Sequence, residues 1–358
     1  MTRSPLTRLA LPLSVIAVAS FACDSSVTPS TGGSGGASTG ATMQTTGSSS
    51  PTSSSSGAGG GEQFSVKFDP ITVPPGTEKT QCVVRKLSNP AAAHVGQIHN
   101  VLGEGSHHLI VYRTADTVEQ TTPFDCQPFS DLLKPEKGTP LMISQKQDDL
   151  LTLPQGVAFS IAKEQFVRLE MHYINATAAP LEVTATTTFI TMEEKDFQNE
   201  ADFLFFGNPD IDLAPNAKAT LGPTYLPLPA TLAGSKFFGF AGHTHQWGTN
   251  VYVGTTTGKT GPDTDVYKVD NWQWAEPATV YWDPPVEVPQ NGGFHLTCEW
   301  ENGSPNNVQF GESANDEMCF FWTYYYPSKG AFVCAHTDKF GGYDLCCPGN
   351  ALCSQLFP

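Results

Sequence analysis

The sequence predicts an all-β protein made of two jelly-roll-like β-sandwich domains behind a disordered N-terminal linker. Glycine (33 residues) and proline (28 residues) are abundant, and charged residues make up only 15% of the chain. Short apolar runs rich in Val, Ile, Thr and Phe are bounded by Pro, Gly or Asn, which is typical of strands and turns. Long stretches with a 3.6-residue apolar period are missing. A coiled coil and a helical repeat are therefore excluded.

Residues 1–22 are typical of an export signal, because arginines precede an apolar run that is too short to span a bilayer as a mature helix. The run ends at Ala22, a small residue directly before Cys23. We therefore expect the Cys23 thiol to be lipidated after cleavage and to anchor the protein to a membrane at the cell envelope. A simple secretory signal is the alternative, because Ser20 stands where a lipidation signal usually has Leu.

Residues 23–61 are predicted to be a tether. From residue 24 onward they are almost entirely Ser, Thr, Gly and Ala and contain no aromatic residue, so they cannot bury enough apolar surface to fold. A flexible tether behind a lipidated cysteine would hold a folded domain away from a membrane surface.

The folded part begins at residue 62, and its length suggests two domains of ordinary size. We expect an N-terminal domain at 62–200, a C-terminal domain at 201–328 and a cysteine-rich tail at 329–358. The segment 193–205, which contains several Glu and Asp residues, is the one place where we expect a helical turn or an interdomain linker. The clearest predicted strands are Val157–Ile161, Phe166–Tyr173, Leu181–Ile190, Phe237–Ala241 and Val308–Phe310.

Net charge and cysteine content indicate which binding partners are excluded and in which redox compartment the protein folds. The formal net charge is -16, which argues against nucleic acid as a partner because phosphate binding needs a basic face. Nine cysteines in a chain with an export signal favour disulfides in an oxidising compartment. The oligomeric state cannot be read from the sequence.

Three histidine patterns stand out. His107 and His108 begin a predicted strand, where neighbours point to opposite faces, so the two can share one metal ion only if the backbone is distorted or the rings use different nitrogens. His172 lies in another predicted strand, where a lone histidine is more often a core or surface residue than a ligand. His243 and His245 are spaced so that both lie on one face of a strand and can close on a single ion.

Met318 adds a thioether in a polar, acidic segment. Taken alone, a methionine is usually core filler. A thioether beside two imidazoles, however, suits Cu(I) and fits neither zinc nor calcium. Copper is therefore the metal that the residue types favour.

Taken in chain order, the motifs His-His, His-Tyr, His-Thr-His and Asp-Glu-Met-Cys resemble those of the copper type II, ascorbate-dependent monooxygenases, the family of dopamine β-monooxygenase and peptidylglycine α-hydroxylating monooxygenase. The resemblance covers roughly residues 64 to 330. It implies two sandwich domains that face each other across an open, water-filled cleft, each with one copper ion. It further implies that one copper is held by His107, His108 and His172 and the other by His243, His245 and Met318.

The resemblance also implies a division of labour. The copper at His107, His108 and His172 would transfer electrons, and the copper at His243, His245 and Met318 would bind dioxygen and substrate. Three imidazoles accommodate both oxidation states of copper, whereas a soft sulfur ligand favours the reduced ion. Ascorbate or another one-electron reductant would be the co-substrate.

The resemblance implies two disulfides, Cys82–Cys126 and Cys298–Cys319. The usual upstream partner of Cys334 is missing, so we expect Cys334 to pair within the tail with Cys346, Cys347 or Cys353. A small metal-binding knuckle with His336 is the alternative for the tail.

Departures from the family pattern bear on the substrate. The position at which the peptidylglycine branch has a carboxylate-binding Arg is Ala241, and Phe320 and Trp322 replace Asn and Tyr after the ligand methionine. A carboxylate without those donors would be costly to bury, so peptide amidation is not expected. The segments Glu170–Tyr173 and Tyr325–Pro327 are closer to the dopamine branch, and the aromatic replacements suggest an apolar or aromatic substrate. Lys236 and Arg113 replace a His and a Cys of the family pattern.

Three hypotheses follow for function. The first is an exported, lipid-anchored two-copper monooxygenase that hydroxylates an activated C–H bond of a small molecule with dioxygen. The second is a non-catalytic copper-binding surface lipoprotein. The third is an adhesion or glycan-binding module whose histidines are incidental. The remaining histidines, at positions 94, 99, 295 and 336, have no assigned role.

Overall fold

Strands dominate the computed structural model, which describes residues 61–126, 138–339 and 342–347. The predicted signal at 1–22, the lipidation site Cys23 and the tether up to residue 60 lie outside the described residues. The 3-10 helices Glu194–Asp196 and Ala230–Leu232 are short, with three residues each. None of the described helices is long or apolar enough to span a membrane. The all-β, sandwich-like fold class is confirmed.

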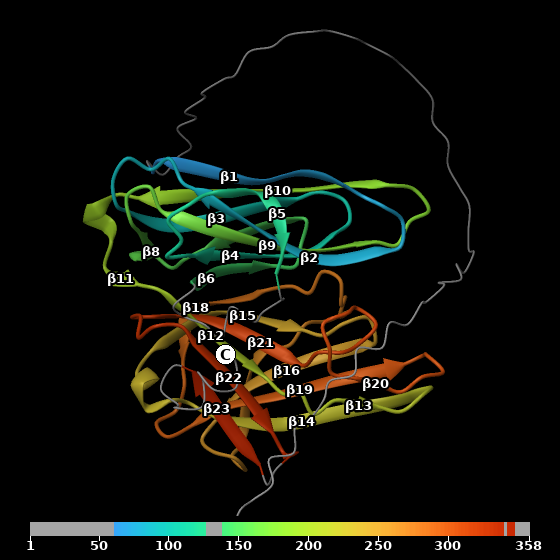
Figure 1. Ribbon diagram of the computed structural model, residues 1–358. Helices are drawn as coiled ribbons and strands as arrows, with labels where there is room; N and C mark the ends of the chain where they lie inside the picture. The colour runs from blue at the N-terminus through green and yellow to red at the C-terminus, as the bar shows by residue number, and fades with distance from the viewer. Residues whose placement is uncertain (1–60, 127–137, 340–341, 348–358) are drawn as a thin grey trace, which may run out of the picture. The chain divides into compact units, whose positions relative to one another are not determined.

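Two sheets are built from strands that precede Ala201. One has six strands: β1 (Gln63–Val73), β10 (Leu181–Met192), β3 (Ala93–Leu102), β8 (Val157–Ile161), β11 (Asn199–Glu200) and β7 (Asp148–Thr152), which pairs with β3. The other has five: β5 (Gln120–Asp125), β2 (Thr77–Lys86), β9 (Phe166–Asn175), β4 (Ser106–Arg113) and β6 (Thr139–Ser144). Figure 1 shows β1, β10 and β3 lying over β2, β9 and β4, as the two layers of a sandwich.

The remaining sheets use strands that follow Ala201. A six-stranded sheet contains β18 (Val280–Glu287), β15 (Lys236–His243), β21 (Phe320–Tyr326), β12 (Asp202–Gly207), β22 (Phe332–Thr337) and β23 (Tyr343–Cys347). A four-stranded sheet contains β14 (Ala217–Pro227), β19 (Gly293–Asn302), β16 (Gly248–Thr256) and β17 (Asp263–Tyr267). A small third sheet pairs β13 (Asp212–Leu213) with β20 (Val308–Gln309).

Residue alternation explains why these strands form sandwiches. In β10 every second residue from Val183 to Thr191 is buried and its neighbours are more exposed, as expected for a strand with one face on a core. β12 is different, because all six of its residues are buried. It lies between β21 and β22 in the middle of its sheet. The acidic segment 193–205 therefore contains the expected helical turn only at Glu194–Asp196 and then enters a central strand.

Two groups of buried side chains form the cores. One fills the space between the β1–β10–β3 and β2–β9–β4 layers and also takes in Ala241, Met318 and Trp322 from later in the chain. The other packs Phe237, Phe294 and their neighbours between the β15–β21 and β19–β16 sheets. The first core thus extends to the strands that carry the second histidine pattern.

The described part of the tail adds two strands to the β15–β21 sheet. β22 pairs with β12 in parallel, and β23 pairs with β22. The tail is therefore continuous with that sheet up to Cys347. The division of the chain into domains at 62–200 and 201–328 stays a prediction.

Candidate copper centres

A β-bulge brings His107 and His108 to one candidate metal site. β4 pairs with β9, and the register shifts between Ser106, which lies opposite Tyr173, and His108, which lies opposite His172. The extra residue is His107. A bulge re-aims side chains that would otherwise alternate between the two faces. It supplies the backbone distortion that two adjacent histidines require.

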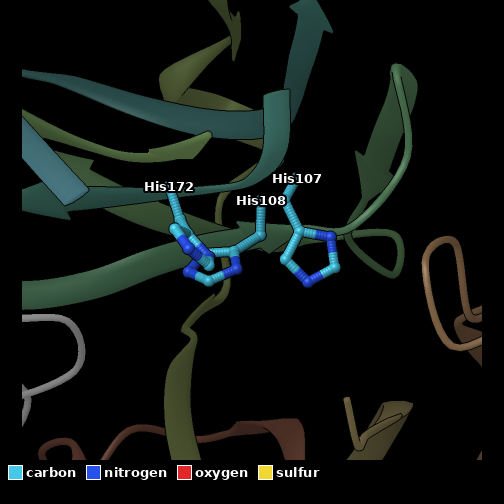
Figure 2. A group of neighbouring side chains, drawn as sticks. All are labelled: His107, His108 and His172. Atoms are coloured by element: carbon cyan, nitrogen blue, oxygen red, sulfur yellow. The ribbon is translucent and has the colours of Figure 1, made fainter. Parts of the chain in front are cut away.

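His172 joins these two rings from the neighbouring strand. Figure 2 shows the three imidazoles gathered below the β4 and β9 ribbons. One ligating nitrogen from each of His107, His108 and His172 lies within 4.8 Å of the other two. The ring centroids are 5.4 Å apart for His107 and His108, 5.3 Å for His107 and His172, and 4.9 Å for His108 and His172. We call this group the three-histidine cluster.

The three-histidine cluster suits a metal ion chemically. Burial, with the neighbouring His172 and His245, lowers the pKa of His107 to about 3, and burial also lowers the pKa of His108. Both rings are therefore neutral near pH 7 and keep a nitrogen lone pair. Within the described part of the chain, Nε2 of His107 and Nδ1 of His172 are buried and have no hydrogen-bond partner. A bound metal ion would satisfy buried nitrogens of this kind, and imidazoles suit copper.

The second pattern places its two histidines on either side of a strand end. β15 ends at His243, and His245 lies in the turn before β16, closed by a hydrogen bond from Gly248 N to His245 O of 3.0 Å. The expectation that both lie within one strand is therefore wrong, because the chain turns after His243. Both side chains are nevertheless buried, and their ring centroids are 5.1 Å apart.

Hydrogen bonds set the tautomers of both rings. The Nδ1 atom of His243 lies 2.6 Å from Oε1 of Gln145, and that of His245 lies 3.2 Å from the Asp316 carbonyl oxygen. Because both partners only accept, Nδ1 carries the proton and Nε2 carries the lone pair. Burial lowers the pKa of His243, and it lowers that of His245 to about 4. Both rings are therefore neutral near pH 7, and each keeps a lone pair on Nε2 that can bind a metal ion.

The backbone of Met318 lies near that of His245. β15 and β21 are antiparallel neighbours, and their ladder ends with His243 opposite Phe320. Met318 is two residues before Phe320, and Oε2 of Glu317 accepts hydrogen bonds from both His245 N and Met318 N. The Met318 side chain is buried. A thioether and two neutral imidazoles together would fit a site for reduced copper. We call these residues the His243–His245–Met318 cluster.

Glu317 ties this cluster together. Its side chain is fully buried, and Oε2 accepts hydrogen bonds from His245 N (2.8 Å), Trp300 Nε1 (2.9 Å) and Met318 N (3.2 Å). Oε1 accepts a fourth from Trp247 N at 2.7 Å. Burial raises the pKa of Glu317 to about 7, against the lowering effect of these donors. One oxygen atom therefore holds the backbones of both His245 and Met318.

The two clusters adjoin each other. The ring centroid of His243 lies 6.0 Å from that of His108 and 6.4 Å from that of His107. Trp274, from the loop between β17 and β18, packs on His107 with ring centroids 5.2 Å apart. Gln145 also donates to the Gly242 carbonyl at 3.1 Å. The five imidazoles thus lie among side chains from both sandwiches.

Three disulfides lie in the described part of the chain. Cys82–Cys126 joins β2 to the end of β5, and Cys298–Cys319 joins β19 to the residue after Met318. These are the two pairs that the family resemblance implies. Cys334 pairs with Cys346, one of the tail partners expected. A metal knuckle at His336 would need those thiolates, so that alternative is wrong. Structural disulfides indicate an exported or extracellular protein.

The residues that depart from the family pattern are mostly structural. Ala241 lies opposite Trp322 in the β15–β21 ladder, and both are buried. Phe320 packs on Phe205 with ring centroids 4.9 Å apart. Arg113 donates to Glu200 Oε1 at 3.0 Å, and Lys236 is exposed at the start of β15. The side chains of Phe320 and Trp322 therefore contribute to cores.

The four histidines without an assigned role each pair with a carboxylate away from the two clusters. These pairs are His94–Glu194 (3.0 Å), His99–Asp148 (2.8 Å), His295–Asp263 (2.6 Å) and His336–Asp344 (2.5 Å).

Three polar residues that touch the clusters were not predicted from the sequence: Glu78, Gln145 and Glu317. Glu78 contacts His172, Gln145 contacts His243, and Glu317 contacts His245. For Glu317 a signal was present, because a carboxylate precedes a methionine and a run of aromatic residues that must be buried. Glu78 and Gln145 carry no local signal, since their partners are 94 and 98 residues away.

Comparison with known proteins gives a family match whose range contains the second cluster. Residues 219–341 match the family model described as "Copper type II ascorbate-dependent monooxygenase, C-terminal domain". This range contains His243, His245, Met318 and the Cys298–Cys319 disulfide.

Among solved structures, the crystal structure of plant peptide RALF23 in complex with FER and LLG2 is similar at 8% identity and a TM-score of 0.20, over 74% of this chain and 90% of that chain. A likeness this low supports no statement about fold or function. The family match supports the copper type II ascorbate-dependent monooxygenase family for residues 219–341, which resemble its C-terminal domain.

Proposed function

We propose that this chain is an exported two-copper monooxygenase that hydroxylates an activated C–H bond of a small, apolar or aromatic substrate. Dioxygen supplies one oxygen atom to the product and one to water, and an external one-electron reductant such as ascorbate supplies the electrons. The observation that carries the proposal is the pair of adjoining groups of buried imidazoles, three in one and two in the other, with the backbones of His245 and Met318 held by the same Glu317 carboxylate.

The residues of each cluster have distinct tasks. His107, His108 and His172 would hold the electron-transfer copper, and His243, His245 and Met318 would hold the second copper. When bound, copper supplies the one-electron chemistry that lets dioxygen react with a C–H bond.

The surrounding protein orients these donors. Gln145 and Asp316 hold the protons on Nδ1 of His243 and His245 and so keep each Nε2 available as a donor. Burial keeps the imidazoles neutral. Glu317 fixes the two backbone segments that present His245 and Met318.

The proposed substrate class depends on the residue at position 241, where this chain has Ala and not Arg. Ala241 stands where a carboxylate-binding arginine would be, and its side chain is buried against apolar neighbours. An anionic substrate group would find no cation at this position, which favours an apolar or aromatic substrate.

Oxygen uptake tests the proposal. The copper-loaded chain is supplied with ascorbate and a panel of phenethyl compounds, and hydroxylated product is measured against oxygen consumed. Met318→Ile should abolish product formation and leave the three-histidine cluster loaded with copper. Met192→Ile, at the end of β10, is the matched control and should retain turnover. Turnover that survives Met318→Ile would refute the assigned division of labour.

A non-catalytic copper-binding surface lipoprotein is the second candidate. Four of the five imidazoles, those of His108, His172, His243 and His245, are at most 3% exposed, as expected of a site that retains ions. The same assay separates the two functions, because a binding protein loads copper but couples no oxygen uptake to product.

The membrane anchor is a separate part of the proposal. We propose that Cys23 carries the lipid and that residues 24–61 tether the folded part to the cell envelope. Metabolic labelling with a fatty acid should mark the wild-type chain and not Cys23→Ala. Equal labelling of both would remove the lipid anchor from the proposal.

A further inference from the structure

Glu78, in β2, bonds to both sides of the paired clusters. Its Oε1 atom accepts hydrogen bonds from His172 Nε2 at 3.1 Å and from Ala314 N at 2.8 Å. Its Oε2 atom accepts one from Ser313 Oγ at 3.0 Å. Ser313 and Ala314 belong to the segment that runs from β20 to Met318. One carboxylate therefore joins a ligand of the three-histidine cluster to the segment that carries the thioether.

The bond to His172 determines which nitrogen faces the cluster. An ionised carboxylate only accepts, so Nε2 of His172 carries the proton and Nδ1 carries the lone pair. Nδ1 of His172 is the buried atom that has no hydrogen-bond partner among the described residues. Carboxylates behind ligating histidines commonly fix the ring in this way, and their loss typically lowers metal affinity by about 10- to 100-fold.

The bonds to Ser313 and Ala314 reach the other cluster through a short chain of contacts. In the same segment, the Asp316 carbonyl oxygen lies 3.2 Å from Nδ1 of His245, and Asn315 Oδ1 accepts a hydrogen bond from Gln246 Nε2 at 2.9 Å. Glu317 then holds the backbone of His245. An anchor at Ala314 therefore fixes the segment that touches the turn around His245.

We propose that Glu78 is a positioning residue shared by the two candidate copper sites, which orients His172 toward the first ion and anchors residues 311–316 beside the second. The inference rests on the proposed function for the identity of the metal. Its structural half, the anchoring of residues 311–316, stands on the contacts alone and is measured without metal.

Hydrogen exchange on the metal-free full chain tests the structural half. Glu78→Ala removes both oxygens that accept the three hydrogen bonds, and we expect the amide of Ala314 and the peptide covering 311–316 to exchange about tenfold faster. Glu78→Gln keeps an oxygen that can accept from His172 and Ala314, so protection should be largely retained. Glu119→Ala is the matched control, because that exposed carboxylate accepts a hydrogen bond from Lys86 N at the other end of β2. It should leave exchange at 311–316 unchanged.

Copper titration against a competing chelator tests the other half. A Met318→Ile background leaves the three-histidine cluster as the expected copper site. In that background Glu78→Ala should weaken copper binding about 10- to 100-fold, and Glu78→Gln should restore most of the loss. Circular dichroism shows whether each variant is folded.

The outcomes separate the inference from the proposed function. Wild-type exchange at 311–316 in folded Glu78→Ala overturns the anchoring role. Unchanged copper affinity in that variant overturns the orienting role. If the unmutated chain binds no copper at all, the proposed function fails, and the exchange experiment still decides the anchoring role.

Discussion

Removal of the Glu317 carboxylate should destabilise the fold strongly. Glu317→Ala leaves four N–H groups without their acceptor: those of His245, Trp247 and Met318 in the backbone and Nε1 of Trp300. The Glu317 side chain is fully buried, so bulk water does not reach these donors in the native protein.

The magnitude follows from the number of donors. A buried donor that loses its partner costs about 1–3 kcal/mol. Water that enters the space left by the carboxylate would satisfy part of the set, so we expect a loss of at least about 3 kcal/mol in the free energy of unfolding. Glu317→Gln keeps one oxygen for the three donors on Oε2 and turns an NH2 group toward Trp247 N. It should therefore cost about 1–3 kcal/mol.

Urea unfolding of the metal-free chain, followed by circular dichroism and tryptophan fluorescence, measures both variants. Glu301→Gln is the control, because Glu301 is exposed on the same β19 strand as Trp300 and its carboxylate lies 3.2 Å from Nζ of exposed Lys218. Surface changes of this kind stay within about 0.5 kcal/mol. A Glu317→Ala variant within about 1 kcal/mol of the wild type would refute the claim that this carboxylate holds the cluster together.

Three further predictions concern the same region. The pKa of His107 is about 3 in the folded protein against an ordinary value near 6.5, so the unfolded chain binds the proton first and the free energy of unfolding falls as the pH drops from 6.5 toward 4. In urea titrations at several pH values, His107→Ala should lose less stability than the wild type over this range. An identical pH dependence of the two proteins would contradict a buried neutral ring. Replacing Cys298 and Cys319 together by Ser opens a loop whose ends are 21 residues apart, and this should lower the free energy of unfolding by about 3 kcal/mol in urea titrations. A loss below about 1 kcal/mol would show that this disulfide does not stabilise the fold. Cu(II) added to the protein should quench the fluorescence of Trp274, whose ring centroid lies 5.2 Å from that of His107. Trp274→Phe should reduce the amplitude of the quenching, whereas the control Trp282→Phe should not. Equal quenching in the two variants would contradict the proposal that copper bound at His107 quenches Trp274.

Much of the fold could be predicted because strand formation depends on local patterns. The runs Val157–Ile161 and Phe237–Ala241 match β8 and the interior of β15, since alternating or continuous apolar residues between turn formers specify buried strands. β12 was not predicted as a strand, because the acidic residues before it suggested a turn and its burial depends on β21 and β22, which come later in the chain.

The candidate ligands could be named from their types and order, but their arrangement could not. Whether His107 and His108 share a site depends on a bulge that only the pairing with β9 creates. The carboxylates and amide that orient the rings, Glu78, Gln145 and Glu317, come from segments far from their partners, and one sequence holds no signal for such contacts.

Counting copper tests the central claim most directly. Metal analysis of the copper-loaded, fully folded chain, combined with electron paramagnetic resonance, should give two ions per chain with distinct signals, and His172→Ala and Met318→Ile should each remove a different one. One ion or none per chain with all six ligands intact would contradict the account.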